Sequence, residues 1–478
     1  MTLCIDPLVS PPPESQWQAL CQALPSDLFR SGNEANSGPA WRISPAPFPL
    51  APRTVATITA LGGDLAAFLR VLGGLYTRSV RGTAPGFIAE YLDAGKPESI
   101  IKLARQNRFK SDIPGVIRPD LILTEGGFIA SEIDSVPGGM GFVGAMTHAY
   151  SGVGADSIGG LNGMIEGFAQ MLLTLSEPAH PHVAIVVSAE SQDYRNELTW
   201  LAEQLNASQL ASATVCSPQD IIFTEEALFV RSVDGREAKI DVLYRNFELF
   251  DLQNVPKSEL MLYAARHQRV KMTPPPRAPL EEKMSFALLH HPRLAKLWSK
   301  ELGEEVFRRL RALFPQTWVL DPRPLPPQAA ISGLEVAGEP VNDWQQLLEL
   351  GKKERDYVVK PSGFSELAWG SRGVTIANDL TKEAWAATLH TALAAYPHTP
   401  HILQRFHKGR RVKTSYFDAN GVLTPLEGRV RLCPYYFVTA EETKLGGILA
   451  TIAPADKRLI HGMSDAIMTT CRIDENGY

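Results

Sequence analysis

The stretch that most constrains the fold of this chain is residues 118–141, RPDLILTEGGFIASEIDSVPGGMG. Apolar runs at 121–123 and 128–133 flank a turn at 125–127, and two such runs joined by a glycine turn predict a β-hairpin. In this hairpin Asp120 lies close to Glu132 on the other strand. Asp134 follows Glu132 by two residues and therefore points to the same face. We expect three carboxylates to converge here.

A cluster of carboxylates needs a cation, because like charges at contact distance raise one another's pKa. Mg²⁺ is the natural candidate, since it prefers hard oxygen ligands and binds one or two carboxylates together with phosphate oxygens. Arg118, two residues before Asp120, is expected to bring positive charge to the same pocket. The Pro-Gly-Gly-Met-Gly run at 137–141 would let the backbone approach a ligand closely. The alternative is an ordinary surface hairpin with a solvated acidic tip.

A second motif lies far along the chain, at residues 356–373. A short strand over 356–361 contains Lys360 and is followed by a loop with Gly370, Ser371, Arg372 and Gly373. A lysine at a strand end can place a point charge on phosphates, and a glycine loop can fold its N–H groups over them. The spacing fits neither a P-loop nor a dinucleotide-binding fold, so the motif alone indicates phosphate binding only weakly.

Together the two motifs resemble the ATP-grasp family. The pattern Arg118-x-Asp120, then Glu132-x-Asp134, then Pro-Gly is similar to the metal-binding end of that fold, although the family usually has Asn at the position of Asp134. Residues 358–361, 370–374, 403–406 and 409–412 are similar to its nucleotide-binding half. Most members place the lysine strand before the carboxylate hairpin. Here the hairpin comes first, which is the circularly permuted order of the glutathionylspermidine synthase synthetase domain and its relatives.

The resemblance covers roughly residues 114–450 and implies a role for each matching residue. ATP and Mg²⁺ are the implied cofactors, and Arg118 is the implied catalytic residue. Lys283, before an apolar helix, is similar to an early lysine that reaches the nucleotide. The implied metal ligands are Asp120, Glu132 and Asp134, and the implied ATP-binding residues are Lys283, Lys360, Gly370, Ser371, Arg372, Gly373, Gln404, Arg405 and Phe406.

The implied activity is that of an ATP-dependent carboxylate–amine ligase, which forms an amide through an acyl phosphate. Two alternatives stay open: a kinase-like phosphotransferase that needs no amine, and a nucleotide-binding scaffold without catalysis. No Cys/His amidase signature is seen, so only a synthetase activity is implied. The partners would be a small carboxylate and an amine, neither of which the sequence identifies.

The fold class expected is α/β (α+β), a permuted ATP-grasp fold with an N-terminal helical region and a small doubly wound α/β subdomain. Helices are expected at 14–24, 54–76, 87–92, 98–106 and 155–176, and the subdomain strands at 182–188, 213–216 and 240–244. Five parts follow: a helical region (1–113), the metal-binding half (114–180), the α/β substrate-side subdomain (181–270), a helical connection (271–345) and the nucleotide-binding half with a C-terminal tail (346–478).

Composition bounds the class of protein. The 478 residues are 44% hydrophobic and 21% charged. Such a chain can bury a sizeable core. A net charge of −5 gives no electrostatic reason to expect nucleic acid or an anionic membrane as partner. The start lacks the layout of a signal peptide, no uninterrupted apolar run has the length of a membrane span, and the five scattered cysteines fit reduced thiols. We expect a cytoplasmic globular protein, and its oligomeric state is open.

Four further charged residues stand out without an assigned role. Arg245 and Glu248 follow a predicted strand, where ligands bind in open α/β sheets, and a surface ion pair is the alternative. Arg429 and Arg431 are two apart on a predicted strand and share a face. For these two, a binding role and a salt-bridged sheet surface are equally consistent with the sequence.

Overall fold

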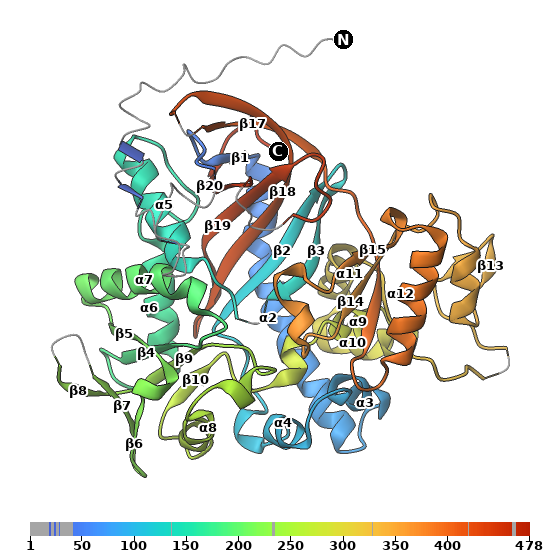
Figure 1. Ribbon diagram of the computed structural model, residues 1–478. Helices are drawn as coiled ribbons and strands as arrows, with labels where there is room; N and C mark the ends of the chain where they lie inside the picture. Colours follow the sequence, from blue (N-terminus) through green and yellow to red (C-terminus); the bar gives the residue numbers. More distant parts are fainter. Residues whose placement is uncertain are drawn as a thin grey trace.

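The computed structural model describes residues 42–478 except 135, 232–234, 327, 419 and 461–464, together with residues 19, 20, 23, 24 and 28 (Figure 1). The helix expected at 14–24 lies almost wholly outside these residues. The architecture is mixed: one large antiparallel sheet, one parallel sheet and smaller antiparallel sheets, with helices packed on their faces. The expected α+β class is confirmed.

The large sheet combines segments from the beginning, middle and end of the chain. Its strand order is β1–β20–β19–β18–β2–β3, and β17 also pairs with β18. All neighbours are antiparallel except β1 and β20. The strands are β1 (Phe48–Leu50), β2 (Val116–Thr124), β3 (Gly127–Asp134), β17 (Arg411–Phe417), β18 (Leu423–Val438), β19 (Thr443–Pro454) and β20 (Ile467–Ile473).

The predicted hairpin is confirmed as β2 and β3. Asp120 stands opposite Glu132, and Arg118 stands opposite Asp134. The pairing shifts by one residue between Asp120 and Leu121, which is a bulge in the strand next to the carboxylates. The register therefore brings the charged end of the two strands together, as their sequence patterns predicted.

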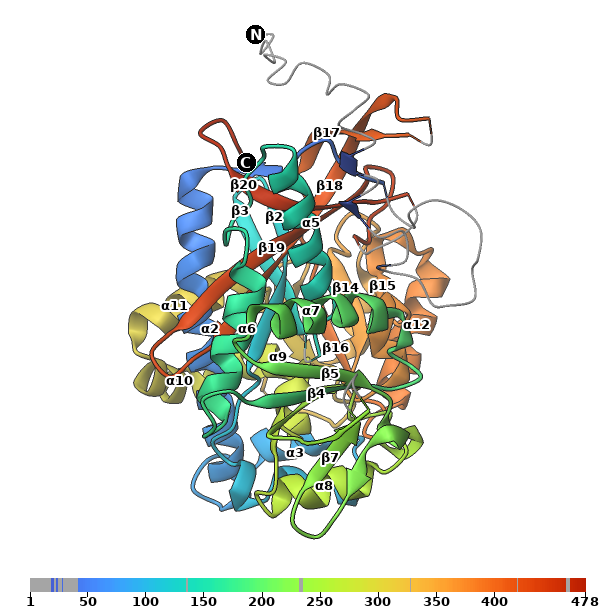
Figure 2. The ribbon, with the colours of Figure 1, turned by 90° about the vertical axis from the view of Figure 1, so that its left-hand side faces the viewer.

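Helices cover both faces of the large sheet (Figures 1 and 2). On one face α2 (Pro52–Val80) packs against side chains such as Leu432 and Tyr436. On the other face α5 (Met140–Gly152) and α6 (Gly163–Leu175) pack against Tyr435 and Phe437. Because successive strand residues point to opposite faces, β18 contributes to both cores.

By length and composition, α2 is the one described helix that could cross a membrane. Half of its most apolar stretch is buried inside the structure. Ile58, Leu65, Phe68 and Leu72 are each fully buried in the core that α2 forms with the large sheet. In this structure the apolar character of α2 is therefore used for packing.

The small doubly wound unit is also confirmed. Its sheet has the order β10–β9–β4–β5 with every pair parallel. The helix α7 packs on one face of this sheet and α8 on the other. The elements are β4 (His182–Val187), α7 (Arg195–Ser208), β5 (Ser212–Cys216), β9 (Val242–Asn246), α8 (Ser258–Arg266) and β10 (Lys271–Thr273), with a small sheet of β6 (Ile222–Phe223), β7 (Leu228–Arg231) and β8 (Glu237–Lys239) beside them.

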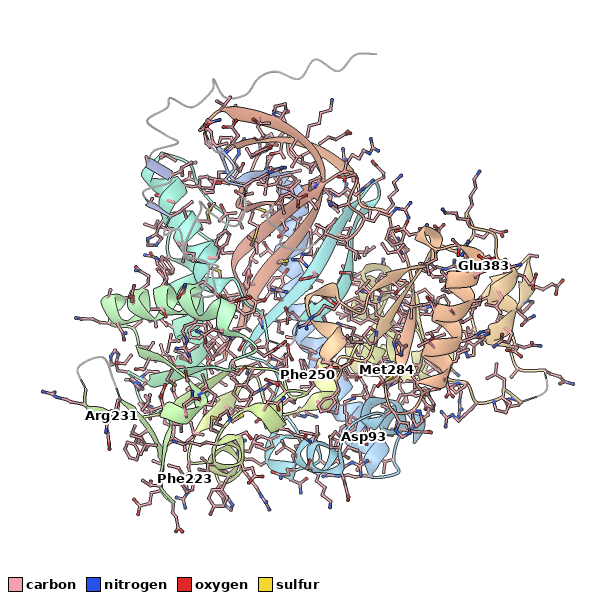
Figure 3. The ribbon with its side chains drawn as sticks, in the orientation of Figure 1. Asp93, Phe223, Arg231, Phe250, Met284 and Glu383 are labelled. Carbon is pink, nitrogen blue, oxygen red and sulfur yellow. The ribbon has the colours of Figure 1, made fainter. Side chains whose placement is uncertain are left out.

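The lysine strand belongs to a third sheet, which is antiparallel with the order β11–β16–β14–β15. Met284, marked in Figure 3, is fully buried and packs against Val319 and Ile402 of this sheet. The elements are β11 (Thr317–Val319), β14 (Tyr357–Pro361), β15 (Thr375–Ile376), α12 (Lys382–Ala394) and β16 (His401–Arg405), with the short β12 (Glu335–Val336) and β13 (Glu339–Pro340) beyond.

The remaining helices join these sheets to α2. Trp298 of α10 and Phe314, which follows α11, pack on Phe68 of α2 with ring centroids 5.5 and 5.1 Å away. The helices are α3 (Phe87–Asp93), α4 (Glu98–Ala104), α9 (Met284–His290), α10 (Ala295–Leu302) and α11 (Glu304–Leu313).

The structure differs from the sequence-based expectation at the helix over 155–176. Only residues 163–175 are helical there, as α6, and a second helix, α5, begins inside the predicted glycine loop. Gly159 and Gly160 have φ angles of +97° and +74°. This left-handed conformation ends any helix. The apolar spacing was recognised, whereas the glycine pair that interrupts it was not.

A second difference concerns the end of the chain. We assigned residues 346–478 to one nucleotide-binding half with a C-terminal tail, and the ATP-grasp resemblance ended near residue 450. The structure instead places β17 to β20 in the large sheet, with the carboxylate hairpin. Local patterns predict a strand but do not say which distant strand will be its neighbour. The proposed limits of the five parts stay a prediction.

Replacing Phe68 with Ala should lower the free energy of unfolding by about 3 to 5 kcal/mol, the cost typical of a large aromatic side chain lost from a core. Phe68 is fully buried between two other rings. Urea denaturation followed by circular dichroism measures the change. The control is Leu173→Ala, at a side chain of α6 that is 38% exposed. A substitution at such a surface position should have little effect. Equal losses in both variants would contradict this packing.

Candidate functional site

The carboxylate end of the hairpin is a network of ion pairs. The Arg118 guanidinium contacts Asp134, and its Nη2 atom lies 3.2 Å from Oδ1 of Asp120. Arg431 of β18 places Nη1 2.8 Å from Oδ2 of Asp120. The Cys433 thiol donates to Oδ1 of Asp120 at 3.3 Å. Asp120 is 1% exposed. Its charge is therefore balanced inside the protein and not by solvent.

Glu132 has a different cation. Nζ of Lys283 lies 2.8 Å from Oε2 of Glu132. The predicted contact of Lys283 with the nucleotide stays a prediction. Burial alone would raise the pKa of Glu132, but Lys283 and Lys360 hold it well below its usual range. The pKa of Asp134 is raised, first by burial and then by the nearby Asp120 and Glu132. The two carboxylates of the Glu-x-Asp motif thus differ in electrostatic environment.

Cations of the protein itself contact the three carboxylates, and the role of these carboxylates as metal ligands stays a prediction. Arg118 lies between Asp120 and Asp134 and binds both. Asp134 also accepts the Val136 N–H at 3.0 Å. Within the described residues no group of three or more His, Cys, Asp or Glu side chains could hold a metal ion. Asp120 and Glu132 still face each other, and two carboxylates with phosphate oxygens are a donor set that suits Mg²⁺.

Lys360 points from β14 toward the hairpin. Its Nζ donates to the Ser131 carbonyl at 2.9 Å, and the residue is 5% exposed. Burial lowers the pKa of Lys360 to about 8. The nearby Glu132 acts in the opposite direction, and Lys283 adds to the lowering. An arriving polyanion would stabilise the charged ammonium and raise this pKa again.

Residues of both motifs line one cavity. Its enclosed volume is about 90 Å³. Ligand pockets usually enclose several times more, so a nucleotide would need the surrounding segments to move apart. Segments from distant parts of the chain thus meet at one place. The predicted residues that line the cavity are Asp120, Glu132, Lys360, Gln404, Arg405 and Phe406, and Arg431 and Arg458 line it as well.

Residues 404–406, which were predicted to lie along the adenine, each make a contact with the surrounding protein. Gln404 is buried and donates from Nε2 to Oγ1 of Thr317 at 3.2 Å. The Arg405 guanidinium carbon lies 4.6 Å from the centre of the Tyr357 ring, a cation–π contact. The Phe406 N–H donates to the carbonyl of residue 356 at 2.9 Å. These contacts fix the end of β16 at the cavity.

The predicted phosphate-covering loop lies beside the cavity. Arg372 extends to the small α/β unit, where its Nη2 lies 3.0 Å from Oε1 of Glu190. The Gly373 N–H donates to the Leu367 carbonyl, and Val374 directly after it lines the cavity. The side chain of Ser371 and the surroundings of Gly370 lie outside what the structure describes. The covering role of residues 370–373 stays a prediction.

A buried glutamate next to Lys283 was missed from the sequence. Glu282 accepts hydrogen bonds from Nζ of Lys96 at 2.7 Å, Oγ of Ser362 at 2.7 Å and the Gly363 N–H at 3.1 Å. Burial would raise the pKa of Glu282, but Lys96 and Ser362 hold it below its usual range. The start of the glycine loop is therefore fastened to a buried carboxylate.

The Pro-Gly-Gly loop has its own buried carboxylate, which was also missed. Glu197 of α7 accepts from the N–H groups of Gly139, Gly141 and Phe142 at the start of α5. Burial raises the pKa of Glu197 to about 7, although these hydrogen bonds act against it. Next to them the Gly138 carbonyl accepts from Nη1 of Arg118 at 3.1 Å. Glu197 thereby helps to position the backbone that holds Arg118.

The three arginines that stood out without a role each make defined contacts. Arg245 is fully buried and pairs with Glu281, so the prediction of a surface ion pair is wrong. Arg429 donates to the carbonyls of residues 409, 455 and 457 and holds the chain around β17 and β19. Arg431 contacts Asp120 in the site. Arg431 and Cys433 are two residues apart on one strand and contact the same carboxylate. This spacing could have indicated from the sequence that Arg431 faces the site.

Comparison with known proteins supports the fold. A solved structure of a glutathione synthetase-like effector from Globodera pallida matches this chain with a TM-score of 0.58 and 13% sequence identity, covering 99% of this chain and 100% of that one. This similarity establishes a shared glutathione synthetase-like α+β fold. It does not extend to activity, because a fold alone does not define a function.

A protein from Methylobacillus flagellatus KT, described as a gamma-glutamylcysteine synthetase, matches 88% of this chain and 91% of its own at 11% identity. Its TM-score of 0.39 is too low to indicate a common fold. No family model and no curated protein matches the sequence.

Lys96→Met should lower the free energy of unfolding by about 3 to 5 kcal/mol, because it leaves the buried carboxylate of Glu282 without its cation. The side chains of Lys96 and Glu282 are 1% and 0% exposed. Thermal and urea denaturation measure the loss. The control is Lys102→Met, since the Lys102 side chain is 72% exposed in its pair with Glu98. Such surface pairs contribute little to stability.

The pH dependence gives a further check of the same ion pair. The pKa of Glu282 is lowered in the folded protein. Its contribution to stability is therefore present above its unfolded pKa and is lost as pH falls through the folded pKa. The difference between wild type and Lys96→Met should therefore be full at pH 7 and shrink as the pH falls below about 4. A difference that stays constant with pH would contradict this assignment.

Proposed function

We propose that this protein is an ATP-dependent carboxylate–amine ligase that uses Mg²⁺. The observation that carries the proposal is the meeting of Asp120, Glu132 and Lys360 at one cavity with the segment 404–406. The ATP-grasp resemblance assigns metal, phosphate and adenine roles to these groups. The glutathione synthetase-like fold agrees with such a ligase.

Asp120 and Glu132 are the residues that would hold Mg²⁺, together with phosphate oxygens. The metal would neutralise charge on the phosphates during transfer to the substrate carboxylate. In the structure these two carboxylates are held by Arg431 and Lys283. We propose that the two cations turn to the nucleotide phosphates when Asp120 and Glu132 bind the metal, so charge balance is kept throughout.

Lys360 would contact the phosphates as well. Its ammonium is buried and hydrogen-bonded to a backbone carbonyl, so it is positioned before the ligand arrives. Phosphoryl transfer depends chiefly on such positioning and on electrostatic stabilisation. Arg118, fixed by Asp134 and the Gly138 carbonyl, would stabilise the acyl phosphate and the oxyanion formed when the amine attacks.

The carboxylate substrate would approach from the small α/β unit. Tyr244 of β9 lies within electrostatic range of Arg118, and in such sheets ligands sit beyond the carboxyl ends of the strands. Among the described residues, the Tyr244 hydroxyl and both polar side-chain atoms of Asn246 are buried without a hydrogen-bond partner. Unpaired buried polar groups are costly, so a polar substrate or ordered water is expected beside them.

The test of this function is ADP release by the purified protein, with MgATP and panels of amino acids, short peptides and polyamines. A ligase releases ADP in proportion to amide formed and only when acid and amine are both present. ADP release without any amine would favour the phosphotransferase alternative. ATP-analogue binding without turnover on any panel would favour the scaffold.

Lys360→Ala should weaken the binding of a non-hydrolysable ATP analogue by about tenfold to a hundredfold, since it removes a charge-assisted contact worth about 1.5 to 3 kcal/mol. Isothermal titration calorimetry measures the affinity. Lys382→Ala, at an exposed position on α12, is the matched control. Unchanged affinity in Lys360→Ala would place the nucleotide elsewhere.

The three hairpin carboxylates should differ in their sensitivity to substitution. Asp120→Asn and Glu132→Gln remove proposed metal ligands and should nearly abolish turnover. Asp134→Asn should leave measurable activity, because Asp134 pairs with Arg118 and the ATP-grasp family usually has Asn there. Steady-state rates over a Mg²⁺ titration measure the effect. Equal loss in all three variants would refute these separate roles.

A further inference from the structure

The loop after the carboxylate hairpin and the start of α5 pack directly on helix α7 of the small α/β unit. Three glycines of this stretch face three residues that are spaced three apart along α7 and its start. A Cβ atom at any of these glycines would overlap the facing residue, so the close approach depends on their having no side chain. The contacts join Gly138 to Tyr194, Gly141 to Glu197 and Gly144 to Trp200. The small α/β unit therefore sets the position of the loop.

Glu197 also holds this loop through hydrogen bonds. One oxygen of its carboxylate accepts the Gly139 N–H at 2.9 Å, and the other accepts the N–H groups of Gly141 and Phe142. Glu197 is fully buried, so the loss of an acceptor here would leave buried N–H groups unsatisfied at a cost in free energy. A carboxylate offers two acceptor oxygens, whereas the amide of glutamine, which has the same size, offers one.

A single peptide unit connects Glu197 with Arg118. The carbonyl of Gly138 and the N–H of Gly139 belong to this unit, which is planar and rigid. The N–H binds Glu197. The carbonyl accepts Nη1 of Arg118 at 3.1 Å and the Tyr435 hydroxyl at 2.7 Å. A rotation of this peptide would therefore disturb the contact with Glu197 and the contact with Arg118 together.

We propose that Glu197 and Tyr435 are positioning residues for Arg118 and act through this one peptide unit. Glu197 holds the N–H, and Tyr435 holds the carbonyl that receives the guanidinium. Because Glu197 belongs to α7, the unit that is proposed to bind the acid also orients the catalytic arginine. The effect on catalysis rests on the proposed function, whereas the orientation of Arg118 does not.

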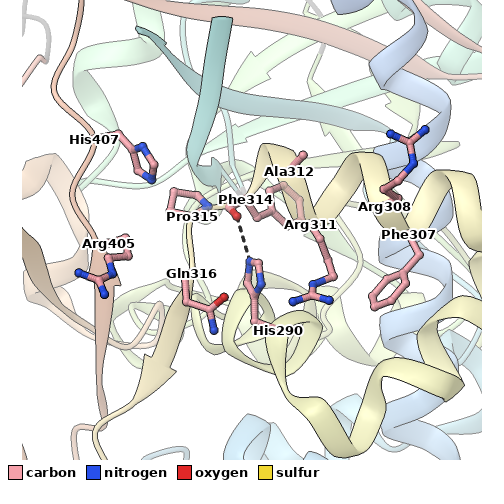
Figure 4. Close-up of a pocket in the computed structure, with 10 residues that line it drawn as sticks. All are labelled: His290, Phe307, Arg308, Arg311, Ala312, Phe314, Pro315, Gln316, Arg405 and His407. Carbon is pink, nitrogen blue, oxygen red and sulfur yellow. Dashed lines mark hydrogen bonds between the residues drawn. The ribbon is translucent and has the colours of Figure 1, made fainter. Parts of the chain in front are cut away.

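The first test measures Arg118 itself, in the full chain without ligands. Phenylglyoxal modifies accessible guanidinium groups, and peptide mass spectrometry gives the rate at each arginine. Glu197→Gln should raise the rate at Arg118 by about threefold or more, since the loss of a hydrogen bond is worth about 0.5 to 1.5 kcal/mol. The rate at Arg429, which is also buried, should stay unchanged. Arg311, exposed beside the cavity drawn in Figure 4, reports the activity of the reagent.

Two further variants make this test decisive. Glu203→Gln, at an exposed position on α7, is the matched control and should leave the rate at Arg118 unchanged. Tyr435→Phe keeps the buried ring and removes only the hydroxyl, and it should raise the rate at Arg118 by about twofold or more. If Glu197→Gln does not fold, Tyr435→Phe decides alone.

Two outcomes would overturn the proposal. The first is an unchanged rate at Arg118 in the variants that fold. The second is an equal rise at Arg118 and Arg429, which would mean that the substitution loosens the large sheet as a whole.

The second test measures catalysis, with MgATP and the substrates that the ADP assay identifies. Glu197→Gln should lower kcat by about tenfold or more, while the Kd of an ATP analogue stays within about twofold of wild type. In an Arg118→Lys background the same substitution should cost little, because its effect passes through Arg118. An equal loss in both backgrounds overturns the proposal. If wild type turns over no substrate, the proposed function fails, while the modification rates still decide how Arg118 is held.

Discussion

The architecture depends on three consecutive charged residues, Glu281, Glu282 and Lys283, whose side chains bind four different parts of the chain. Glu281 pairs with Arg245 of the small α/β unit, and Lys283 pairs with Glu132 of the hairpin. Glu282 joins the helical region through Lys96 and the glycine loop through Ser362. Buried ion pairs add little net stability. An arrangement of the chain that separated the two partners would leave a buried charge unpaired, at a large cost in free energy. This segment thereby fixes how the parts meet.

The cost of an unpaired buried charge also explains why the charged groups around the candidate site are paired with one another. Arg118, Arg431, Lys283 and Lys360 surround the carboxylates of the hairpin, and each cation already has a protein acceptor. Binding a metal–nucleotide complex would exchange these contacts for others of the same kind. Polar groups held in advance need little reorganisation when charge develops.

The hairpin and its register could be predicted because the information is local: two short apolar runs, a glycine turn and a spacing of two between Glu132 and Asp134. The parallel unit was predicted for a similar reason. The cation partners could not be, since Lys283 is 151 residues from Glu132 and Lys96 is 186 residues from Glu282. The convergence of Asp120, Glu132 and Lys360 came from the family resemblance. The insertion of Arg118 between two carboxylates depends on side-chain geometry that no spacing encodes.

The large sheet also has a consequence for the order of folding. Strand β1 near the start of the described chain pairs with β20 near its end, and β18 and β19 close the sheet around the early hairpin. During synthesis α9, α10 and α11 can pack on α2 as soon as they are made, whereas the large sheet is completed only after residues 467–473 have left the ribosome. The parallel unit at 182–273 is continuous in sequence and can form earlier. Closure of this long-range sheet is then the step that we expect to limit the rate of folding.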